Sequence, residues 1–295
     1  MMKKFAAFAF LAAAPLFAAE PPGEGGVFME AYRECRIVAI QDQSMTMPGR
    51  LFSSIDPNET FEPAKAYAAS LNVFLVQDLR SGKNALIDAG YGKAENRLVE
   101  KLAALNVKPE DISAVFITHI HPDHVGGLTT PEGKAAFPNA SILIARKEYD
   151  EWRRDPSRAA LARHLTPNLD RLILLDYDRE VAPFGLTPLY YPGHTPGHTV
   201  FRMTVTREGN APEPVFFVGD IVHAGELQIP RPQFCARFDK TPATAVKSRR
   251  ELLKAAPVWH GAHLPFPGIA RILHESPLKS QQSRGRIGFA KSSPR

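Results

Sequence analysis

Most apolar residues of this chain occur in short unbroken runs that are separated by turn-forming residues. These runs are rich in valine, isoleucine and phenylalanine, which is typical of buried strands. Residues 71–78 (LNVFLVQD) and 83–90 (KNALIDAG) flank Ser81-Gly82 and predict a hairpin. We expect further strands at residues 35–42, 112–118, 141–145, 186–193, 199–206 and 214–220.

Three segments have helical character instead. Residues 94–107 place Leu98, Leu102 and Leu105 on one face, and Pro109 follows. The other two helices are expected at residues 147–155 and 241–256, the latter with Thr241 as its cap and Pro242 in first position. Residues 44–69, rich in proline, methionine and serine, are expected to form a long loop with a short helix. Two groups of strands with helices between them predict an α/β layered fold, as one domain over about residues 27–270.

The N-terminus has the organisation of a secretory signal peptide. Lys3 and Lys4 precede an apolar run from Phe5 to Phe17, and small residues follow at 18 and 19. The run is shorter than the roughly 20 residues that span a bilayer, so we expect no stable membrane anchor. The sequence therefore predicts a signal peptide over about residues 1–18 and a periplasmic or secreted protein.

The formal charge of +5 comes from the two ends of the chain. The signal supplies two lysines, and residues 271–295 form a basic tail, expected to be disordered, with six basic residues and one acidic residue. The body between them is nearly neutral, so we expect no nucleic-acid partner. Cys35 and Cys235 are 200 positions apart, and the sequence leaves open whether they form a disulfide or remain two buried thiols.

The segment THIHPDHVGG contains the densest group of histidines in the chain. His119, His121, Asp123 and His124 follow a predicted buried strand, where loops commonly carry functional side chains. Pro122 disfavours helix at His121, so we expect an irregular loop that can direct several side chains into one small volume. Imidazole nitrogen and carboxylate oxygen are ligands that suit Zn²⁺, with Mn, Co, Ni or Fe as alternatives.

Three later polar residues also follow apolar runs and are flanked by glycine: His194, Asp220 and His263. Each alone is a weak indication, because a histidine at the end of a strand is more often a structural residue. Together with the first cluster they supply five histidines and two aspartates. That set is large enough for two metal ions.

With these motifs in place, the sequence resembles the metallo-β-lactamase-fold superfamily over about residues 35–270, and most closely its exported branch similar to methyl parathion hydrolase and lactonases. The resemblance implies a four-layer αββα sandwich. It also implies that His119, His121 and His194 hold one metal, that Asp123, His124 and His263 hold the other, and that Asp220 bridges them. The family usually closes with a strand after HLPFPGI, but residues 276–295 show no strand pattern.

The implied activity is that of an exported binuclear metal-dependent hydrolase in which a metal-bridging hydroxide attacks an ester, lactone or phosphotriester. Asp220 and His223 are the catalytic candidates; His223 either donates a proton to the substrate or only orients a ligand. His198 is expected to be structural. The proposed walls of an apolar pocket for a small ester or lactone are Phe52, Trp152, Phe234 and Phe266.

Two other readings of these residues remain. One is a β-lactamase, which export would suit, although Asp220 together with His124 resembles the lactonase branch better. The other is a non-catalytic metal-binding protein on the same scaffold, which the complete ligand set disfavours. A homodimer is left open.

Overall fold

The computed structural model of the protein describes residues 25–59, 65–93, 97–155 and 158–272. Within these residues the larger sheet has seven strands. In spatial order they are β1 (Val27–Ala31), β2 (Cys35–Pro48), β4 (Ala66–Asp78), β5 (Asn84–Ile87), β6 (Ile112–Ile117), β7 (Ser141–Ala145) and β8 (Leu172–Leu175). The expected hairpin is confirmed, because β4 and β5 pair antiparallel with Phe74 opposite Ile87. From β5 to β8 the strands run parallel, so their carboxyl ends share one edge.

A second sheet of five strands faces the first. Its order is β14 (Ile269–Arg271), β13 (Val258–Gly261), β11 (Glu213–Gly219), β10 (Thr199–Val205) and β9 (Thr187–Tyr190). The strands β11 and β13 are parallel and the other pairs are antiparallel. A small third sheet pairs β3 (Phe52–Ser54) with β12 (Phe234–Ala236).

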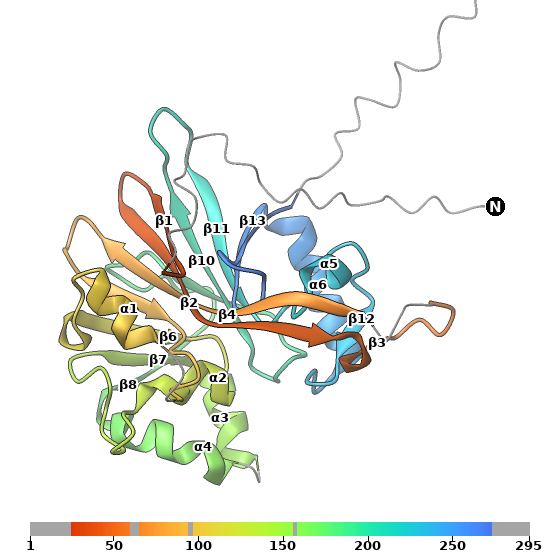
Figure 1. Cartoon of the computed structure of the whole chain (residues 1–295), viewed down its shortest axis with the longest axis horizontal. Helices are drawn as coiled ribbons and strands as arrows, with labels where there is room; N and C mark the ends of the chain where they lie inside the picture. Colours follow the sequence, from red (N-terminus) through yellow and green to blue (C-terminus); the bar gives the residue numbers. More distant parts are fainter. Residues whose placement is uncertain (1–24, 60–64, 94–96, 156–157, 273–295) are drawn as a thin grey trace, which may run out of the picture.

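Helices cover the outer faces of both large sheets. They are α1 (Leu98–Ala104), α3 (Arg146–Arg154), α4 (Arg158–Leu165) and α6 (Pro242–Ala255). The short helix α2 (Pro122–Val125) follows the edge of the first sheet, and α5 (Gly225–Gln228) packs beside the third sheet. Figure 1 shows α1, α3 and α4 on one side of the molecule and α5 and α6 on the other.

Three apolar layers hold this arrangement together. Alternate residues of β4 face opposite ways: Phe74 packs between the two sheets, whereas Leu75 packs under the outer helices with Leu98 and Leu102 of α1. On the second sheet, Trp259 packs with the α6 residues into a third core. The layers are therefore helices, sheet, sheet and helix, which confirms the αββα sandwich expected from the sequence.

The expectation of a long loop over residues 44–69 is wrong at both ends. Strand β2 continues to Pro48, and its last residues pair with β4, with Met45 opposite Ala69 and Met47 opposite Tyr67. Met47 and Tyr67 then pack with Phe52 in a separate small core. The alternation of methionine with serine and threonine in this segment is a strand pattern, and a shift in register between Gln41 and Gln43 accommodates it.

The described part of the chain ends just after β14, and its cysteines and helices can be compared with the expectations from the sequence. Strand β14 pairs with β13 and lies just before the segment in which we expected no strand. The predicted tail starts at residue 271, and the structure places Arg271 at the end of β14 and buries Ile272. Residues 273–295 of the tail and the predicted signal peptide lie outside the described residues, so both stay predictions. None of the helices in the described part is long and apolar enough to cross a membrane. Cys35 and Cys235 are both buried and free of a disulfide.

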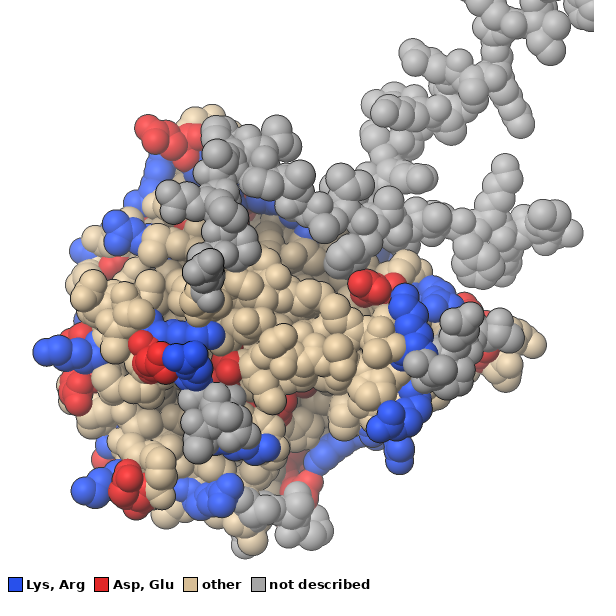
Figure 2. Space-filling model, viewed as in Figure 1, with Lys and Arg blue, Asp and Glu red and all other residues tan. Residues whose placement is uncertain are grey.

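Charge on the described surface is mixed. On the face shown in Figure 2, basic and acidic side chains are both present, and a broad uncharged area lies between them. The absence of a nucleic-acid partner stays a prediction.

Candidate metal centre

The first histidine cluster lies where β6 ends, at the carboxyl edge of the parallel strands. His121 has the extended backbone that a residue before proline favours, with φ −110° and ψ 160°. The expectation of a purely irregular loop is wrong, however, because Pro122 begins the short helix α2, which contains Asp123 and His124. Proline suits this first helical position since its missing N–H would have no partner there.

Gly126 and Gly127 serve close packing rather than an unusual turn. Gly126 has an ordinary helical φ of −58°. A side chain on it would lie 2.0 Å from the carbonyl oxygen of Tyr91, and one on Gly127 would lie 1.9 Å from that of Ala89. The histidine segment is thereby fixed against the loop that follows β5.

The remaining three residues reach the same place from the second sheet. His194 follows β9, Asp220 directly follows β11, and His263 follows β13. Gly219 has a φ of +49°, which lets β11 turn sharply before Asp220. The structure thus brings all seven residues predicted as metal ligands to one edge of the sandwich.

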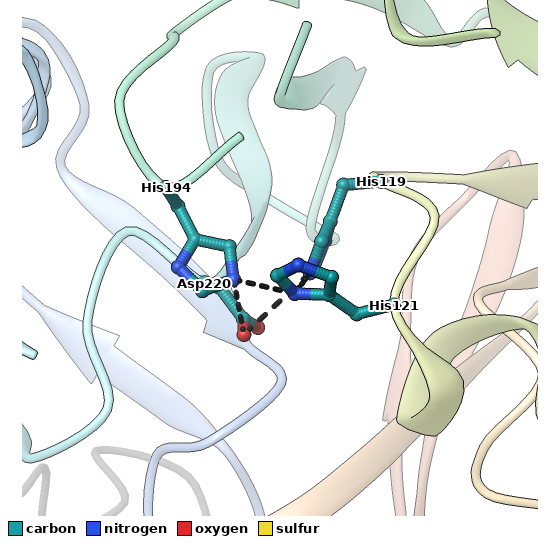
Figure 3. Close-up of side chains that lie close together, drawn as sticks. All are labelled: His119, His121, His194 and Asp220. Atoms are coloured by element: carbon teal, nitrogen blue, oxygen red, sulfur yellow. Dashed lines mark hydrogen bonds and ion pairs between the residues drawn. The ribbon is translucent and has the colours of Figure 1, made fainter. Parts of the chain in front are cut away.

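Three histidines and the aspartate form a first group of donors, shown in Figure 3. His121 Nδ1 lies 2.9 Å from His119 Nε2 and 2.9 Å from His194 Nε2. Asp220 Oδ2 lies 3.2 Å from His194 Nε2 and 3.7 Å from His119 Nε2. All these side chains are buried except His121, which is half-buried.

Asp123, His124 and His263 form a second group beside the first. His263 Nε2 lies 3.4 Å from Asp123 Oδ2. Asp220 reaches this group as well, with Oδ1 3.2 Å from His124 Nε2 and Oδ2 3.2 Å from His263 Nε2. Asp220 therefore stands between the two groups, where a carboxylate could bridge two cations.

The residues present fit a pair of divalent cations. His124 Nε2 and Asp220 Oδ1 are deeply buried and lie 3.2 Å apart as an ion pair, but neither atom has a partner in hydrogen-bond geometry among the described residues. Buried polar atoms are rarely left in that state unless an ion or water satisfies them. The donors are imidazole nitrogens and carboxylate oxygens, the chemistry that zinc and its neighbours accept.

The two groups differ in their protonation. Burial lowers the pKa of His119 well below its usual value and that of His121 to about 3, so these two imidazoles are neutral. For His263 burial also favours the neutral form, but Asp220 and Asp123 raise its pKa to about 10. Burial alone would raise the pKa of Asp220, yet the positive charge of His263 and His124 holds it well below its usual range. In the second group, the positive charge of His263 therefore faces the carboxylates, in the place where a bound metal ion would supply positive charge instead.

The carboxylate of Asp88 positions two histidine rings of the segment after β6, His124 directly and His119 through Thr118. Asp88 Oδ2 lies 2.7 Å from His124 Nδ1 and accepts the hydroxyl of Thr118 at 2.9 Å. Thr118 Oγ1 lies 3.1 Å from His119 Nδ1. Such contacts hold the distal nitrogen of a ligand ring and set which nitrogen faces the metal. Sequence analysis missed Asp88, although an aspartate between the end of a strand and Gly90 was a visible indication.

The carboxylate of Asp239, which was not predicted from the sequence, positions His194 in the loop that extends from the second sheet. Asp239 Oδ1 lies 3.1 Å from His194 Nδ1. Arg249 of α6 is fully buried, with Nη2 3.7 Å from Asp239 Oδ2, and it donates to the carbonyl oxygens of Ile221 at 2.7 Å and Phe234 at 2.6 Å. No sequence pattern near residue 239 pointed to this role.

The other two histidines of interest take distinct positions. His198 accepts the backbone N–H of Asp220 at 3.0 Å and lies 3.2 Å from the Tyr191 carbonyl oxygen, which is the structural position expected of it. His223 has Nε2 3.1 Å from Asp220 Oδ2, and its ring stacks on that of His263 at 5.2 Å. It lies in the site, and its role stays a prediction.

The four aromatic residues predicted as pocket walls pack mainly into cores. Phe52 and Phe234 are buried together in the small core around β3 and β12. Trp152 packs under the first sheet, and Phe266 packs at the margin of the core between the sheets. Their placement in a pocket stays a prediction. Phe238, which the sequence did not indicate, is 44% exposed, and its ring lies 5.6 Å from that of His223.

The family model of the metallo-beta-lactamase superfamily matches residues 68–276, and the chain belongs to this superfamily. It is 36% identical over 117 residues to an N-acyl homoserine lactonase of Bacillus cereus, which covers 39% of this chain and 42% of that protein. It is 32% identical over 181 residues to a hydroxyacylglutathione hydrolase of Synechococcus, covering 61% and 58%. The chain thus spans about half the length of these curated relatives.

Two solved structures share the fold over most of their length. The hydrolase AbOPH of the beta lactamase superfamily superposes with a TM-score of 0.71 at 25% identity, covering 85% of this chain and 99% of that one. AidC, a dizinc quorum-quenching lactonase in complex with a product, gives a TM-score of 0.72 at 25% identity, covering 85% and 95%. The resemblance to the lactonase branch is confirmed.

Proposed function

We propose that this protein is a binuclear metal-dependent hydrolase that opens lactones. One observation carries the proposal: seven donor side chains from both sheets converge in two groups, and Asp220 contacts both. His119, His121 and His194 would hold one cation, and Asp123, His124 and His263 the other. Zinc is the metal we expect first, since AidC is described as a dizinc enzyme.

The substrate class rests on the relatives and on chemistry. Several N-acyl homoserine lactonases of Bacillus align with this chain, and AidC holds N-hexanoyl-homoserine as its product. A lactone is a carboxylic ester, so its hydrolysis needs a polarised carbonyl, an activated water and a proton for the leaving oxygen. When bound, two cations supply the first two requirements by acting as Lewis acids and lowering the pKa of water.

The protein's own residues provide orientation and the proton. Asp88 and Asp239 hold the distal nitrogens of His124 and His194 and so direct the other nitrogen of each ring into the site. Ring opening adds an oxygen to the carbonyl carbon and breaks its bond to the ring oxygen, which then takes up a proton. We assign that proton to His223, because its ring is buried in the site with Nε2 3.1 Å from Asp220 Oδ2, and neither ring nitrogen has a partner in hydrogen-bond geometry among the described residues.

Metal analysis paired with a substrate panel tests the proposal. The panel contains N-acyl homoserine lactones, 4-nitrophenyl esters, an aryl phosphotriester, a thioester and nitrocefin. We expect about two metals per chain and the highest kcat/KM on lactones, with His121→Ala inactive. Less than one metal per chain, or turnover of nitrocefin alone, would overturn the proposal.

The role of His223 has its own test. In His223→Gln we expect lactone hydrolysis to fall by about 10²-fold or more, the usual contribution of a positioned acid. Hydrolysis of 4-nitrophenyl esters should fall much less, because nitrophenolate leaves without a proton. An equal loss on both substrates would instead assign His223 to ligand orientation.

We also propose that the protein is exported, on the basis of Lys3, Lys4 and the apolar run that follows them. Expression of the full chain with a C-terminal tag should give a shortened product in the periplasmic or extracellular fraction. The control is Phe10→Asp, which interrupts the apolar run and should leave the full-length chain in the cytoplasm. Full-length, cytoplasmic wild-type protein would contradict export.

A further inference from the structure

Glu148 is the one acidic residue of α3 that is buried, with 3% of its surface exposed. Its carboxylate receives three hydrogen bonds and makes none with any of the seven metal-ligand candidates. Oε1 accepts the backbone N–H of Ile120 at 2.9 Å. Oε2 accepts the hydroxyl of Thr195 at 2.7 Å and the backbone N–H of Gly197 at 3.1 Å.

These three donors belong to two different loops of the site. Ile120 lies between His119 and His121 in the loop after β6, whereas Thr195 follows His194 directly in the loop after β9. The first loop extends from the larger sheet and the second from the smaller one. One buried carboxylate thus connects the two loops that together carry the three-histidine group.

The second loop is also packed directly on the helix. A side chain at Gly197 would lie 2.3 Å from both the backbone nitrogen and the Cα of Glu148, so only glycine permits this approach. The hydroxyl of Tyr177 donates to the Gly197 carbonyl oxygen at 2.8 Å and fixes the loop from a further direction. The loop carrying His194 therefore has a defined position relative to α3.

We propose that Glu148 is a positioning residue that sets the spacing between His194 and the His119/His121 pair, and so the affinity of the three-histidine site for its metal. The proposal rests on the proposed function, since it takes the three histidines as ligands of one cation. It predicts an effect confined to that cation, because the second group has its supports elsewhere, in Asp88 and the Ser70 carbonyl oxygen.

The two oxygens of Glu148 explain why an acid is needed here. Each oxygen serves one loop, so the pair must both be acceptors. Glutamine has nearly the same shape but only one acceptor oxygen. In Glu148→Gln one of the two loops must lose its anchor and face an amide N–H₂ instead.

The test compares Glu148→Gln with a control variant at Glu151 and with two variants at Thr195, all in the full-length, metal-loaded protein. Glu151→Gln is the matched control, since Glu151 lies one turn further along α3 and its carboxylate pairs with the exposed Arg154. Thr195→Val removes the hydroxyl at nearly constant shape, and Thr195→Ser restores it. The readouts are metals per chain during graded dialysis against a chelator and the absorption spectrum of the Co²⁺-substituted protein.

We expect Glu148→Gln to release one of two metals at about 10- to 100-fold lower chelator concentration than wild type, with a changed Co²⁺ spectrum for that site. The second metal should stay at wild-type affinity. Thr195→Val should weaken the same metal, Thr195→Ser should recover most of its affinity, and Glu151→Gln should match wild type.

The proposal is overturned if Glu148→Gln and Thr195→Val keep both metals at wild-type affinity. It is also overturned if they lose both metals equally, in step with a lower unfolding temperature, because that result assigns Glu148 to general stability. If Glu148→Gln does not fold, the Thr195 pair decides alone. A wild-type protein that binds two metals but opens no lactone would refute the proposed function and leave these outcomes decisive for Glu148.

Discussion

Two buried clusters of histidine and carboxylate lie where the two sheets meet, and they differ in how far their polar atoms are satisfied. In one, Glu30 of β1 contacts His260 Nε2 at 2.8 Å and Arg207 Nη2 at 2.6 Å, so both of its oxygens are paired. Arg207 also contacts Glu213, and only His260 Nδ1 lacks a partner. In the metal centre, by contrast, His124 Nε2, Asp220 Oδ1 and both nitrogens of His223 have no partner in hydrogen-bond geometry among the described residues, although ion pairs bring some of them within 3.2 Å of one another.

The difference separates a structural cluster from a functional one. Glu30 and its partners complete each other and connect β1 to the second sheet without any added group. The metal centre has a similar chemical composition, but its donors point at a shared volume that the protein itself leaves unsatisfied. Several unpartnered donors that are directed at one volume therefore indicate a site for an added group, whereas acids and histidines that pair with each other can hold the fold by themselves.

The largest effect that separates the two clusters is expected at Asp220. Asp220→Asn keeps the shape but removes the charge that both donor groups contact. We expect loss of at least one metal and a fall in lactone kcat/KM on the order of 10³-fold, since metal catalysis supplies several kcal/mol. Elemental analysis and steady-state kinetics measure both. Unchanged metal content would contradict the bridging position.

At the structural cluster, Glu30→Gln should affect stability alone. Removing the charge leaves His260 and Arg207 without their buried partner, which we expect to lower the free energy of unfolding by about 3 kcal/mol. Arg207 retains Glu213, so we do not expect a larger effect. Urea unfolding gives the stability change. Metal content per folded chain should equal that of wild type, and a lost metal would show that the clusters are coupled.

The contacts of Glu30 with His260 and Arg207 predict that the stability of the fold depends on pH. Burial would raise the pKa of Glu30, but His260 and Arg207 lower it from 4.5 to about 2. A depressed carboxyl pKa stabilises the fold above pH 4.5, and this contribution disappears as the pH falls to about 2. The stability difference between wild type and Glu30→Gln should therefore be full at pH 6 and shrink by up to about 3 kcal/mol towards pH 2. Urea unfolding at several pH values checks it; a constant difference would be inconsistent with this ionisation.

The smallest effect is expected behind the metal centre. Asp239→Asn leaves an amide beside His194 Nδ1 and weakens the preference for the ring orientation that serves the site. We expect metal affinity or activity to fall by about 10- to 100-fold with little change in secondary structure. Chelator titration and circular dichroism measure the two quantities. Wild-type affinity in this variant would show that Arg249 and the loop alone position His194.

The fold and the seven donor residues could be predicted from the sequence for a simple reason. Each of the seven follows an apolar run with strand character, and most are accompanied by glycine or proline, so local pattern alone placed them at strand ends. Segment 44–48 was missed because methionine, serine and threonine in alternation resemble a loop in composition. Their alternation is nevertheless a strand pattern, and the pairing with β4 confirms the strand.

The supporting residues could not be predicted in the same way. Glu148 is 47 positions from Thr195, and Asp239 is 45 positions from His194, so their roles exist only once the two sheets have packed. Asp88 is an intermediate case, since it ends a strand as the ligands do. The aromatic residues show the opposite limit: Phe234 and Phe238 look alike in sequence, yet one is buried and the other is half in solvent.

Arg249 has a consequence for how a substrate meets this protein. Its buried guanidinium holds the carbonyl oxygens of Ile221, Pro232 and Phe234, so the chain between Asp220 and β12 is fastened to α6 from within. Freeing that segment would strand a positive charge in a dry interior, which is energetically prohibitive. On the function proposed above, the segment that carries His223 is therefore already in place before a substrate arrives, and binding does not have to order it.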